Sequence, residues 1–186
     1  MSNPEDWATT VVESNGADLL RYISRRSATE RAELLNETLS IIWERRSAVP
    51  ANPVEARMWS FGVARNVLRQ HRRRLTQQKR LLEAIRLEID GTDTASADPE
   101  HSVELSERVR RVHQALRALR PADRELVVLV HWDGFTVSDA ATLLKLNPST
   151  ARTRYSRAKQ LLASQLAEYG ALKPPNAPKA RADVET

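Results

Sequence analysis

The chain has 186 residues, 41% of them hydrophobic, which is enough apolar material for one ordinary domain or two small ones. Its formal charge of +5 favours a polyanionic partner. The absence of cysteine excludes disulfides and thiolate metal sites, and no apolar run approaches the ~18 residues that span a bilayer. Because no basic-then-apolar signal segment opens the chain, we expect a cytoplasmic protein without membrane insertion.

Charge changes sign along the chain in four blocks. Residues 17–56 carry six basic and six acidic residues, and residues 57–80 carry eight basic residues and no acid. Residues 83–107 carry eight acids against one arginine, and residues 108–166 carry eleven basic residues against four acids. The acidic block contains a small, polar stretch without helical periodicity, which predicts a linker. Since glycine is scarce and Ala, Leu, Arg and Glu dominate, we expect an all-α fold of two small helical domains joined by an acidic flexible linker.

The first domain, residues 17–82, is predicted to bury one core between three helices. Gly16 separates its first apolar stripe from a weak N-terminal segment, residues 1–16. The second helix is expected over residues 30–49, and the third from Val54 past Arg74. The predicted inner positions are Leu19, Leu20 and Ile23, then Leu34, Leu35, Thr38, Leu39, Ile42 and Trp43, then Met58, Phe61, Ala64 or Arg65, and Leu68.

The second domain, residues 108–168, opens with apolar residues at helical spacing: Val109, Val112, Leu116 and Leu119. Pro121 suits the first turn of the next helix, and Gly134 suits its end. Residues 169–186 are rich in proline and have little to bury, which predicts a disordered tail.

Residues 134–158 have the pattern of a helix-turn-helix. Thr136 is a cap for the first helix, and Ala140 and Ala141 are small enough to let a second helix cross closely. Asn147 followed by Pro148 predicts a capped second helix that continues to about Leu166.

The second helix of this motif has one apolar and one polar face. Arginine is suited to a bidentate contact with guanine, so Arg152, near the start of the helix, is the predicted base-reading residue. Arg154, Arg157 and Lys159 are predicted to contact phosphates. Any single arginine could instead solvate an ordinary amphipathic helix, but the capped helix and its grouped arginines favour DNA binding. The polar face is formed by Ser149, Arg152, Thr153, Ser156 and Arg157.

Three segments in this order resemble the extracytoplasmic-function (ECF) class of bacterial sigma factors in the sigma-70 family. They are AELLNETLSIIW at residues 32–43, WSFGVARNVLR at 59–69 with HRRR at 71–74, and the helix-turn-helix through Ala158. The resemblance covers roughly residues 17–166 and implies that residues 17–82 are sigma region two and residues 108–168 are sigma region four. It implies RNA polymerase core, promoter DNA and an anti-sigma factor as partners, and no cofactor or metal.

The resemblance also implies roles for individual residues. The residues implied to bind polymerase are Glu33, Leu35, Asn36 and Glu37. Recognition and melting of the minus-ten element falls to Trp59, Asn66, Arg69, Arg72, Arg73 and Arg74. Recognition of the minus-thirty-five element falls to Ser149, Arg152, Thr153, Ser156, Arg154 and Arg157.

Three positions leave alternatives open. Trp59 and Phe61 could stack on flipped bases, although aromatic residues on so apolar a helix more often belong to a core. Lys145 occupies a turn position where the family often has glycine, which indicates either a turn without positive φ or mild strain.

Other functions remain as alternatives. An enzyme is least favoured, because His71, His101, His113 and His131 lack ligand spacing and no nucleophile motif is recognisable. A free-standing helix-turn-helix regulator would leave the upstream basic helix unexplained. A sigma mimic that titrates an anti-sigma protein would not need the arginines.

Overall fold

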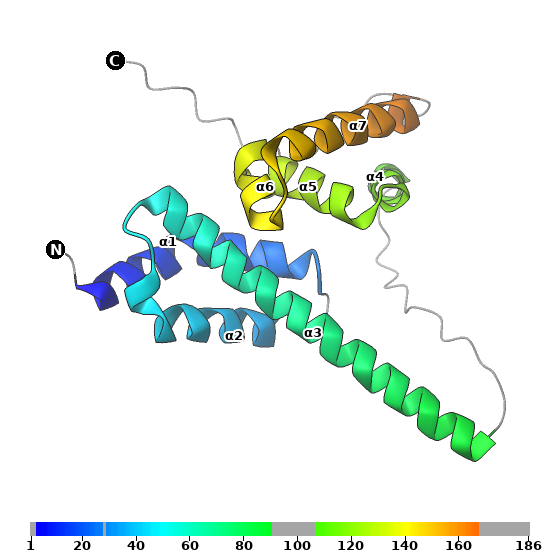
Figure 1. The fold of residues 1–186 in the computed structure, drawn as a ribbon, viewed down its shortest axis with the longest axis horizontal. Helices are drawn as coiled ribbons and strands as arrows, with labels where there is room; N and C mark the ends of the chain where they lie inside the picture. The colour runs from blue at the N-terminus through cyan, green and yellow to red at the C-terminus, as the bar shows by residue number, and fades with distance from the viewer. Residues whose placement is uncertain (1–2, 28, 91–106, 168–186) are drawn as a thin grey trace. The chain divides into compact units, whose positions relative to one another are not determined.

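The computed structural model describes residues 3–27, 29–90 and 107–167, and every regular element within these ranges is helical (Figure 1). The helices divide into two compact units, α1–α3 in the N-terminal unit and α4–α7 in the C-terminal unit. The predicted all-α class with two small helical domains is confirmed.

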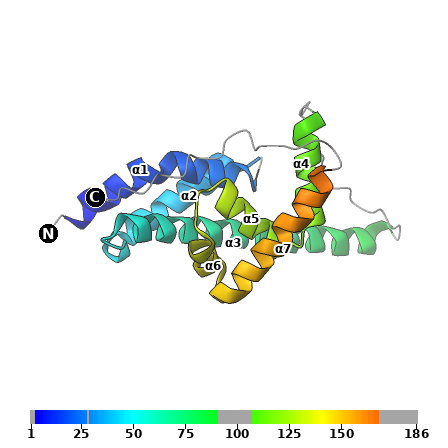
Figure 2. The same cartoon turned by 90° about the horizontal axis from the view of Figure 1, so that it is seen from above.

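The N-terminal unit is a bundle in which each of three helices packs against the other two (Figures 1 and 2). Its elements are α1 (Pro4–Ser24), α2 (Arg31–Glu44), a short 3₁₀ turn η1 (Arg46–Ala48) and α3 (Pro53–Asp90). The predicted inner residues Leu34, Thr38 and Ile42 of α2 are buried, but Trp43 is 45% exposed, so its assignment to the core is wrong. Trp43 follows the buried Ile42 by one position, and a step of about 100° around the helix turns it away from the core.

The predicted break at Gly16 is also wrong, because α1 runs through it without interruption. Ala8, Val11 and Leu19 are all buried and continue one apolar stripe across the glycine. The stripe therefore stabilises residues 4–24 as one helix through packing, which outweighs the low helix propensity of a single glycine.

Helix α3 is longer than its buried face requires. Its 38 residues make it about 57 Å long at ~1.5 Å per residue, and it extends well past α1 and α2 (Figure 1). The predicted linker was expected to begin at residue 83, but residues 83–90 are helical because neither Gly nor Pro occurs between Gly62 and Gly91. The rest of that linker up to residue 106, and the predicted tail of residues 169–186, lie outside the described residues.

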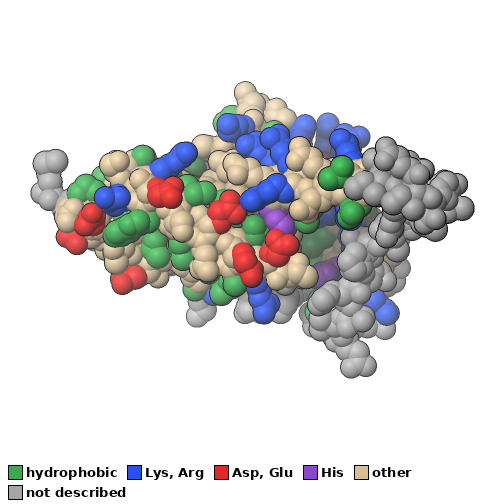
Figure 3. Space-filling model, turned by 90° about the horizontal axis from the view of Figure 1, so that it is seen from below, with side chains coloured by type: hydrophobic (Ala, Val, Ile, Leu, Met, Phe, Trp, Pro, Cys, Tyr) green, Lys and Arg blue, Asp and Glu red, His purple; other side chains and the backbone are tan. Residues whose placement is uncertain are grey.

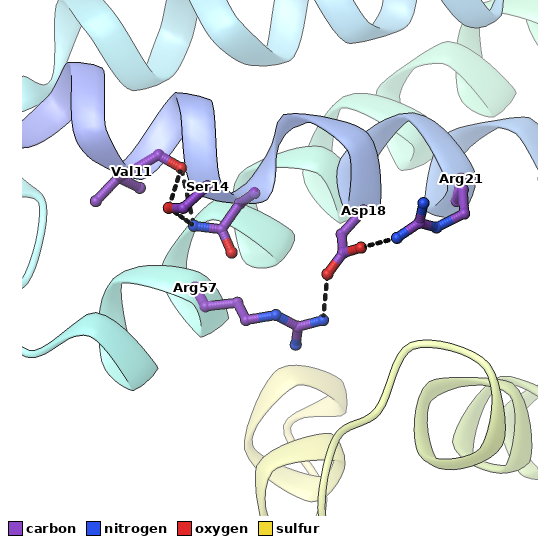
Figure 4. Close-up of polar contacts among 6 residues, drawn as sticks. Val11, Ser14, Asp18, Arg21 and Arg57 are labelled. Atoms are coloured by element: carbon purple, nitrogen blue, oxygen red, sulfur yellow. Dashed lines mark hydrogen bonds and ion pairs between the residues drawn. The ribbon is translucent and has the colours of Figure 1, made fainter. Parts of the chain in front are cut away.

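The polar side chains inside the N-terminal unit form hydrogen bonds and ion pairs with other groups of the same unit. The buried Asn15, Thr38 and Ser60 donate hydrogen bonds of 2.7–2.8 Å to backbone carbonyls one turn earlier in their own helices. Asp18 of α1 lies between two arginines and accepts from Arg57 of α3 at 3.0 Å as well as from Arg21 (Figure 4). The Asp18–Arg57 ion pair ties α1 to the start of α3.

Four helices form the described part of the C-terminal unit. They are α4 (Glu107–Ala118), α5 (Pro121–His131), α6 (Val137–Leu144) and α7 (Pro148–Ala167). Pro121 is the first residue of α5 as predicted, and Leu126, Val127 and Leu129 of this helix are buried. Helix α7 contacts all three other helices of the unit, so the core holds α7 in place.

Arg124 closes the end of α4. Its Nε atom donates to the carbonyl of Leu116 at 2.7 Å, and Nη2 donates to the carbonyls of Arg117 and Leu119 at 2.9 and 3.2 Å. The end of a helix leaves its last carbonyls without the usual partner four residues on, and here one side chain bonds three carbonyls, of which that of Leu116 also accepts from the backbone N–H of Leu119 at 3.2 Å.

Among the described residues, no helix is both long enough and apolar enough to cross a membrane.

Candidate nucleic-acid interface

Helices α6 and α7 form the predicted helix-turn-helix, and the two predicted caps are confirmed. Thr136 accepts a hydrogen bond from the backbone N–H of Asp139 at 3.1 Å, while the Asp139 carboxylate accepts from the backbone N–H of Thr136 at 3.3 Å. Asn147 accepts from the backbone N–H and the hydroxyl of Ser149 at 2.9 and 2.7 Å. Capping from both residues fixes where each helix begins.

The two helices cross closely because the residues between them are small. Ala140 and Ala141 of α6 and Ala151 of α7 are all fully buried. A larger side chain at any of these positions would push the helices apart, since a packed core has no space to receive it.

The turn between the helices uses a left-handed residue. Lys145 has φ 56° and ψ 42°, so the alternative of mild strain holds and the alternative of a turn without positive φ does not. The backbone N–H of Leu146 donates to Ala141 at 2.8 Å and that of Lys145 to Thr142 at 3.1 Å, which is the Schellman pattern that usually has glycine at this position.

A Lys145→Gly change is therefore expected to stabilise the C-terminal unit by about 0.5–1 kcal/mol. Glycine removes the steric cost of a Cβ in the left-handed region, and its greater freedom in the unfolded chain offsets part of that gain. Trp132 is the one tryptophan in residues 107–167, so the ¹⁹F signal of 5-fluorotryptophan there would follow denaturation of this unit. Lys145→Ala is the control, because it removes the charge and keeps the Cβ; equal stabilisation by both variants would exclude strain.

The polar face of α7 is open to solvent. Ala151 and Ala158 are buried and Tyr155 is half-buried, so the opposite side of the helix faces outward. The exposed residues on that side are Ser149, Arg152, Thr153, Ser156 and Arg157. The structure thus places five of the six residues predicted for the minus-thirty-five element on one open surface.

Arg154 is placed differently from the other two arginines. It is half-buried, and its Nε atom lies 3.9 Å from Oδ1 of Asp123 in α5. That carboxylate oxygen is buried and has no hydrogen-bond partner among the described residues, so Arg154 is the cation that compensates it. Arg154 is therefore a weaker candidate for DNA contact than Arg152 or Arg157.

Behind the polar face, Tyr155 packs on His131 of α5. The Tyr155 hydroxyl lies 3.0 Å from Nε2 of His131, and the rings stack with centroids 5.9 Å apart. Burial, and secondarily the charge of Lys159, lower the pKa of His131 below its ordinary value of 6.5; burial raises the pKa of Tyr155. The imidazole is therefore neutral at pH 7.

This environment predicts that acid destabilises the C-terminal unit. Because the pKa of His131 is lower in the folded chain, the unfolded chain binds more protons between the folded value and about 6.5. The free energy of unfolding should accordingly fall as pH drops below about 6.5, until the folded-state pKa is passed. Denaturation followed at Trp132 from pH 7.5 to 5 measures this, and a His131→Phe variant should lose most of the dependence. An unchanged slope in that variant would assign the effect to other groups.

The second predicted DNA-binding surface lies on α3. Trp59 is half-buried, and the Asn66 and Arg69 side chains are exposed and joined by a 3.3 Å hydrogen bond. At about 100° per residue, Trp59, Asn66, Arg69 and Arg73 share one face, whereas Arg72 projects from another side. All four arginines predicted for the minus-ten element are exposed: Arg69, Arg72, Arg73 and Arg74.

Phe61 does not belong to this surface. It is 1% exposed and makes an edge-to-face contact with Tyr22 at 5.1 Å between ring centroids. Stacking of Phe61 on a base would require the bundle to open, so the core alternative holds for this residue.

The predicted polymerase-binding residues lie on α2. Glu33 and Asn36 are exposed and Glu37 is half-buried on the same side of the helix, while Leu35 lies closer to the buried side. The face that includes α2 has acidic side chains among hydrophobic and basic ones (Figure 3). Glu37 makes a contact that its sequence position does not indicate: both of its carboxylate oxygens accept from Nη2 of Arg74, at 3.3 and 3.2 Å.

Within residues 3–27, 29–90 and 107–167, no three His, Asp or Glu side chains lie together in a way that could hold a metal ion.

Comparison with known proteins agrees with this geometry. Residues 109–162 match the family model described as sigma-70, region 4, which spans most of the C-terminal unit. The ECF RNA polymerase sigma factor SigL of Mycobacterium tuberculosis is 26% identical over 164 residues, covering 85% of this chain and 88% of that protein.

Two solved structures share the fold. The sigma factor RpoE of Bartonella quintana, solved in complex with the anti-sigma factor NepR, has a TM-score of 0.56 and 22% identity, covering 89% of this chain and 99% of that one. CnrH, solved in complex with the cytosolic domain of CnrY, has a TM-score of 0.57 and 19% identity, covering 88% and 89%. The region 4 match and the similarity to SigL over 85% of the chain agree with the predicted resemblance to the ECF class of the sigma-70 family of RNA polymerase sigma factors.

Proposed function

We propose that this protein binds RNA polymerase core and directs promoter-specific initiation by reading the minus-ten and minus-thirty-five elements. Sigma factors are not a class of enzymes, and the proposed role is one of binding. Since its partner would be RNA polymerase, the role places the chain in the cytoplasm.

The observation that carries the proposal is the open polar face at the start of α7. A recognition helix reads base edges with its first turns, and here these turns present hydroxyl groups and two exposed arginines from a rigidly capped helix. We assign sigma region four to the C-terminal unit, Arg152 to base recognition and Arg157 to the phosphate backbone.

We assign sigma region two to the N-terminal unit. Its α3 helix presents Asn66 with exposed arginines and has no acidic residue between positions 57 and 80. A single strand of DNA needs cations along its backbone and polar or aromatic groups for its bases, and the half-buried Trp59 is the aromatic group nearest to Asn66 on this face.

Binding of core is assigned to α2. Glu33, Asn36 and Glu37 form a polar, partly acidic surface on one side of this helix. Docking on core would hold both units at a fixed separation on DNA, so that two weak contacts act together.

An anti-sigma protein is a further proposed partner. Of the two structures that share this fold, RpoE was solved with the anti-sigma factor NepR and CnrH with the cytosolic domain of CnrY.

The test is binding of the purified protein to its host's core RNA polymerase, measured by co-elution in size exclusion and by fluorescence anisotropy. We expect a one-to-one complex that Glu37→Arg weakens at least tenfold. Glu55→Arg is the matched control, because it makes the same charge change at an exposed position in the first turn of α3. No complex with active core would contradict the proposal and favour a free-standing regulator or a sigma mimic.

A further inference from the structure

One ion pair joins the two surfaces assigned to different partners in the N-terminal unit. Glu37 belongs to the surface on α2 that we assign to polymerase, and Arg74 is one of the exposed arginines of α3 that we assign to the minus-ten element. The carboxylate of Glu37 and the guanidinium of Arg74 lie 3.2 Å apart, and 37 positions separate the residues in the sequence.

The ion pair uses both carboxylate oxygens of Glu37 but only one nitrogen of Arg74. Both carboxylate oxygens of Glu37 accept from the same nitrogen of Arg74, so the Arg74 Nη1 and Nε groups remain directed elsewhere. The side chains are 57% exposed for Arg74 and 36% exposed for Glu37, so both can be reached by a partner. An exposed pair of this kind is weak enough to exchange and is screened by salt.

Neutralising Arg74 lowers its attraction for a phosphate. A guanidinium that is bound to a carboxylate must give up or share that contact before it can bind a phosphate at full strength. Only then does its positive charge displace a counterion from the DNA. Glu37 is therefore an internal competitor for the phosphate that Arg74 would bind. Glu33 is exposed on the same side of α2, but it makes no ion pair with Arg74.

We propose that Glu37 serves two partners in turn: it holds Arg74 in the free protein, and it releases Arg74 to the promoter backbone when polymerase engages α2. This inference rests on the proposed function, and it makes Glu37 a positioning residue for DNA as well as a polymerase contact. The consequence is an order of events, in which binding of core precedes full-strength binding of DNA.

The first arm of the test uses the free, full-length protein and a fluorescein-labelled 20-nucleotide single strand. Glu37→Gln should raise affinity about two- to fivefold at 50 mM NaCl, and it should steepen the plot of log K against log salt by up to ~0.7, the value for one added phosphate contact. In an Arg74→Gln background, Glu37→Gln should have no such effect. Glu33→Gln is the control for loss of one negative charge on the same face.

The second arm adds core polymerase at concentrations that saturate each variant. Wild type and Glu37→Gln should then bind promoter DNA with equal affinity, because Glu37 no longer competes. An equal gain from Glu33→Gln in the first arm, or a gain that survives Arg74→Gln, would overturn the pairing itself. Failure of the wild-type chain to bind core would overturn the proposed function and the release step, and the first arm would still report on the pair.

Discussion

Replacing Phe61 with alanine is expected to lower the free energy of unfolding of the N-terminal unit by about 3–5 kcal/mol, the usual cost of deleting a buried aromatic ring. Phe61 is 1% exposed, and its ring contacts one side chain of α1 and one side chain of its own helix α3. Tyr22 meets its ring edge to face at 5.1 Å, and the Arg57 guanidinium lies 4.7 Å from its ring centroid. The variant would lose all of these contacts and leave a cavity between α1 and α3.

A loss of this size is a large part of the 5–15 kcal/mol that ordinarily stabilises a small domain. Denaturation followed by the ¹⁹F signals of Trp7, Trp43 and Trp59 would report on this unit, while Trp132 would report on the C-terminal unit and should be unaffected. Trp59→Ala is the control, since a half-buried ring loses less on truncation and is expected to weaken binding of single-stranded DNA instead. A stable Phe61→Ala protein that has lost DNA binding would place Phe61 on the DNA surface.

Helix ends in the C-terminal unit could be predicted because local chemistry decides them. Thr136 and Asn147 cap the helices they precede, and Pro121 opens α5, as their residue types indicate. A capping hydrogen bond joins residues two or three positions apart, so the sequence contains both partners in one window.

A capping signal of the same kind marks the start of α1, although the apolar residues after Gly16 indicate a later start. Asn3 precedes Pro4 and accepts from the backbone N–H of Glu5 at 3.2 Å, and Asn52 precedes Pro53 and accepts from Val54 at 2.9 Å. The Asn-Pro pair thus begins three of the seven α-helices in the described residues, α1, α3 and α7, and it marks α1 as beginning well before Gly16.

Contacts between distant residues could not be predicted in this way. Glu37 and Arg74 each have a plausible role alone, and only the packing of α2 against α3 brings them together. His131 and Tyr155 are 24 positions apart, and their stacking depends on how α7 crosses α5. Periodicity identifies which face of a helix is buried, whereas it does not specify which residue of another helix that face meets.

The left-handed turn at Lys145 is an intermediate case. The helix-turn-helix pattern locates the turn, but a lysine there gives no local signal for positive φ. The turn geometry follows from the two helices, which are held by the buried Ala140, Ala141 and Ala151. Tertiary packing thus imposes a backbone conformation that the residue type disfavours.

Replacing Arg152 with alanine is expected to reduce promoter affinity by about 1–3 kcal/mol, and to do so by relaxing the preference at one base pair of the upstream element. Arg152 is exposed one position after the buried Ala151, in the second turn of a helix capped by Asn147. At that position the arginine side chain is long enough to reach a base edge, while the helix backbone itself stays farther from the base.

The measurement is binding of the reconstituted complex of core and this chain to a promoter library randomised across the upstream element. For Arg152→Ala, one position of the selected motif should lose its preference while the others keep theirs. Arg157→Ala is the matched control, because a phosphate contact carries no sequence information and its loss should weaken all sequences alike and lower the salt slope by about one. If Arg152→Ala also weakened every sequence equally, Arg152 would be a phosphate contact, and base recognition would fall to the neighbouring Ser149, Thr153 and Ser156.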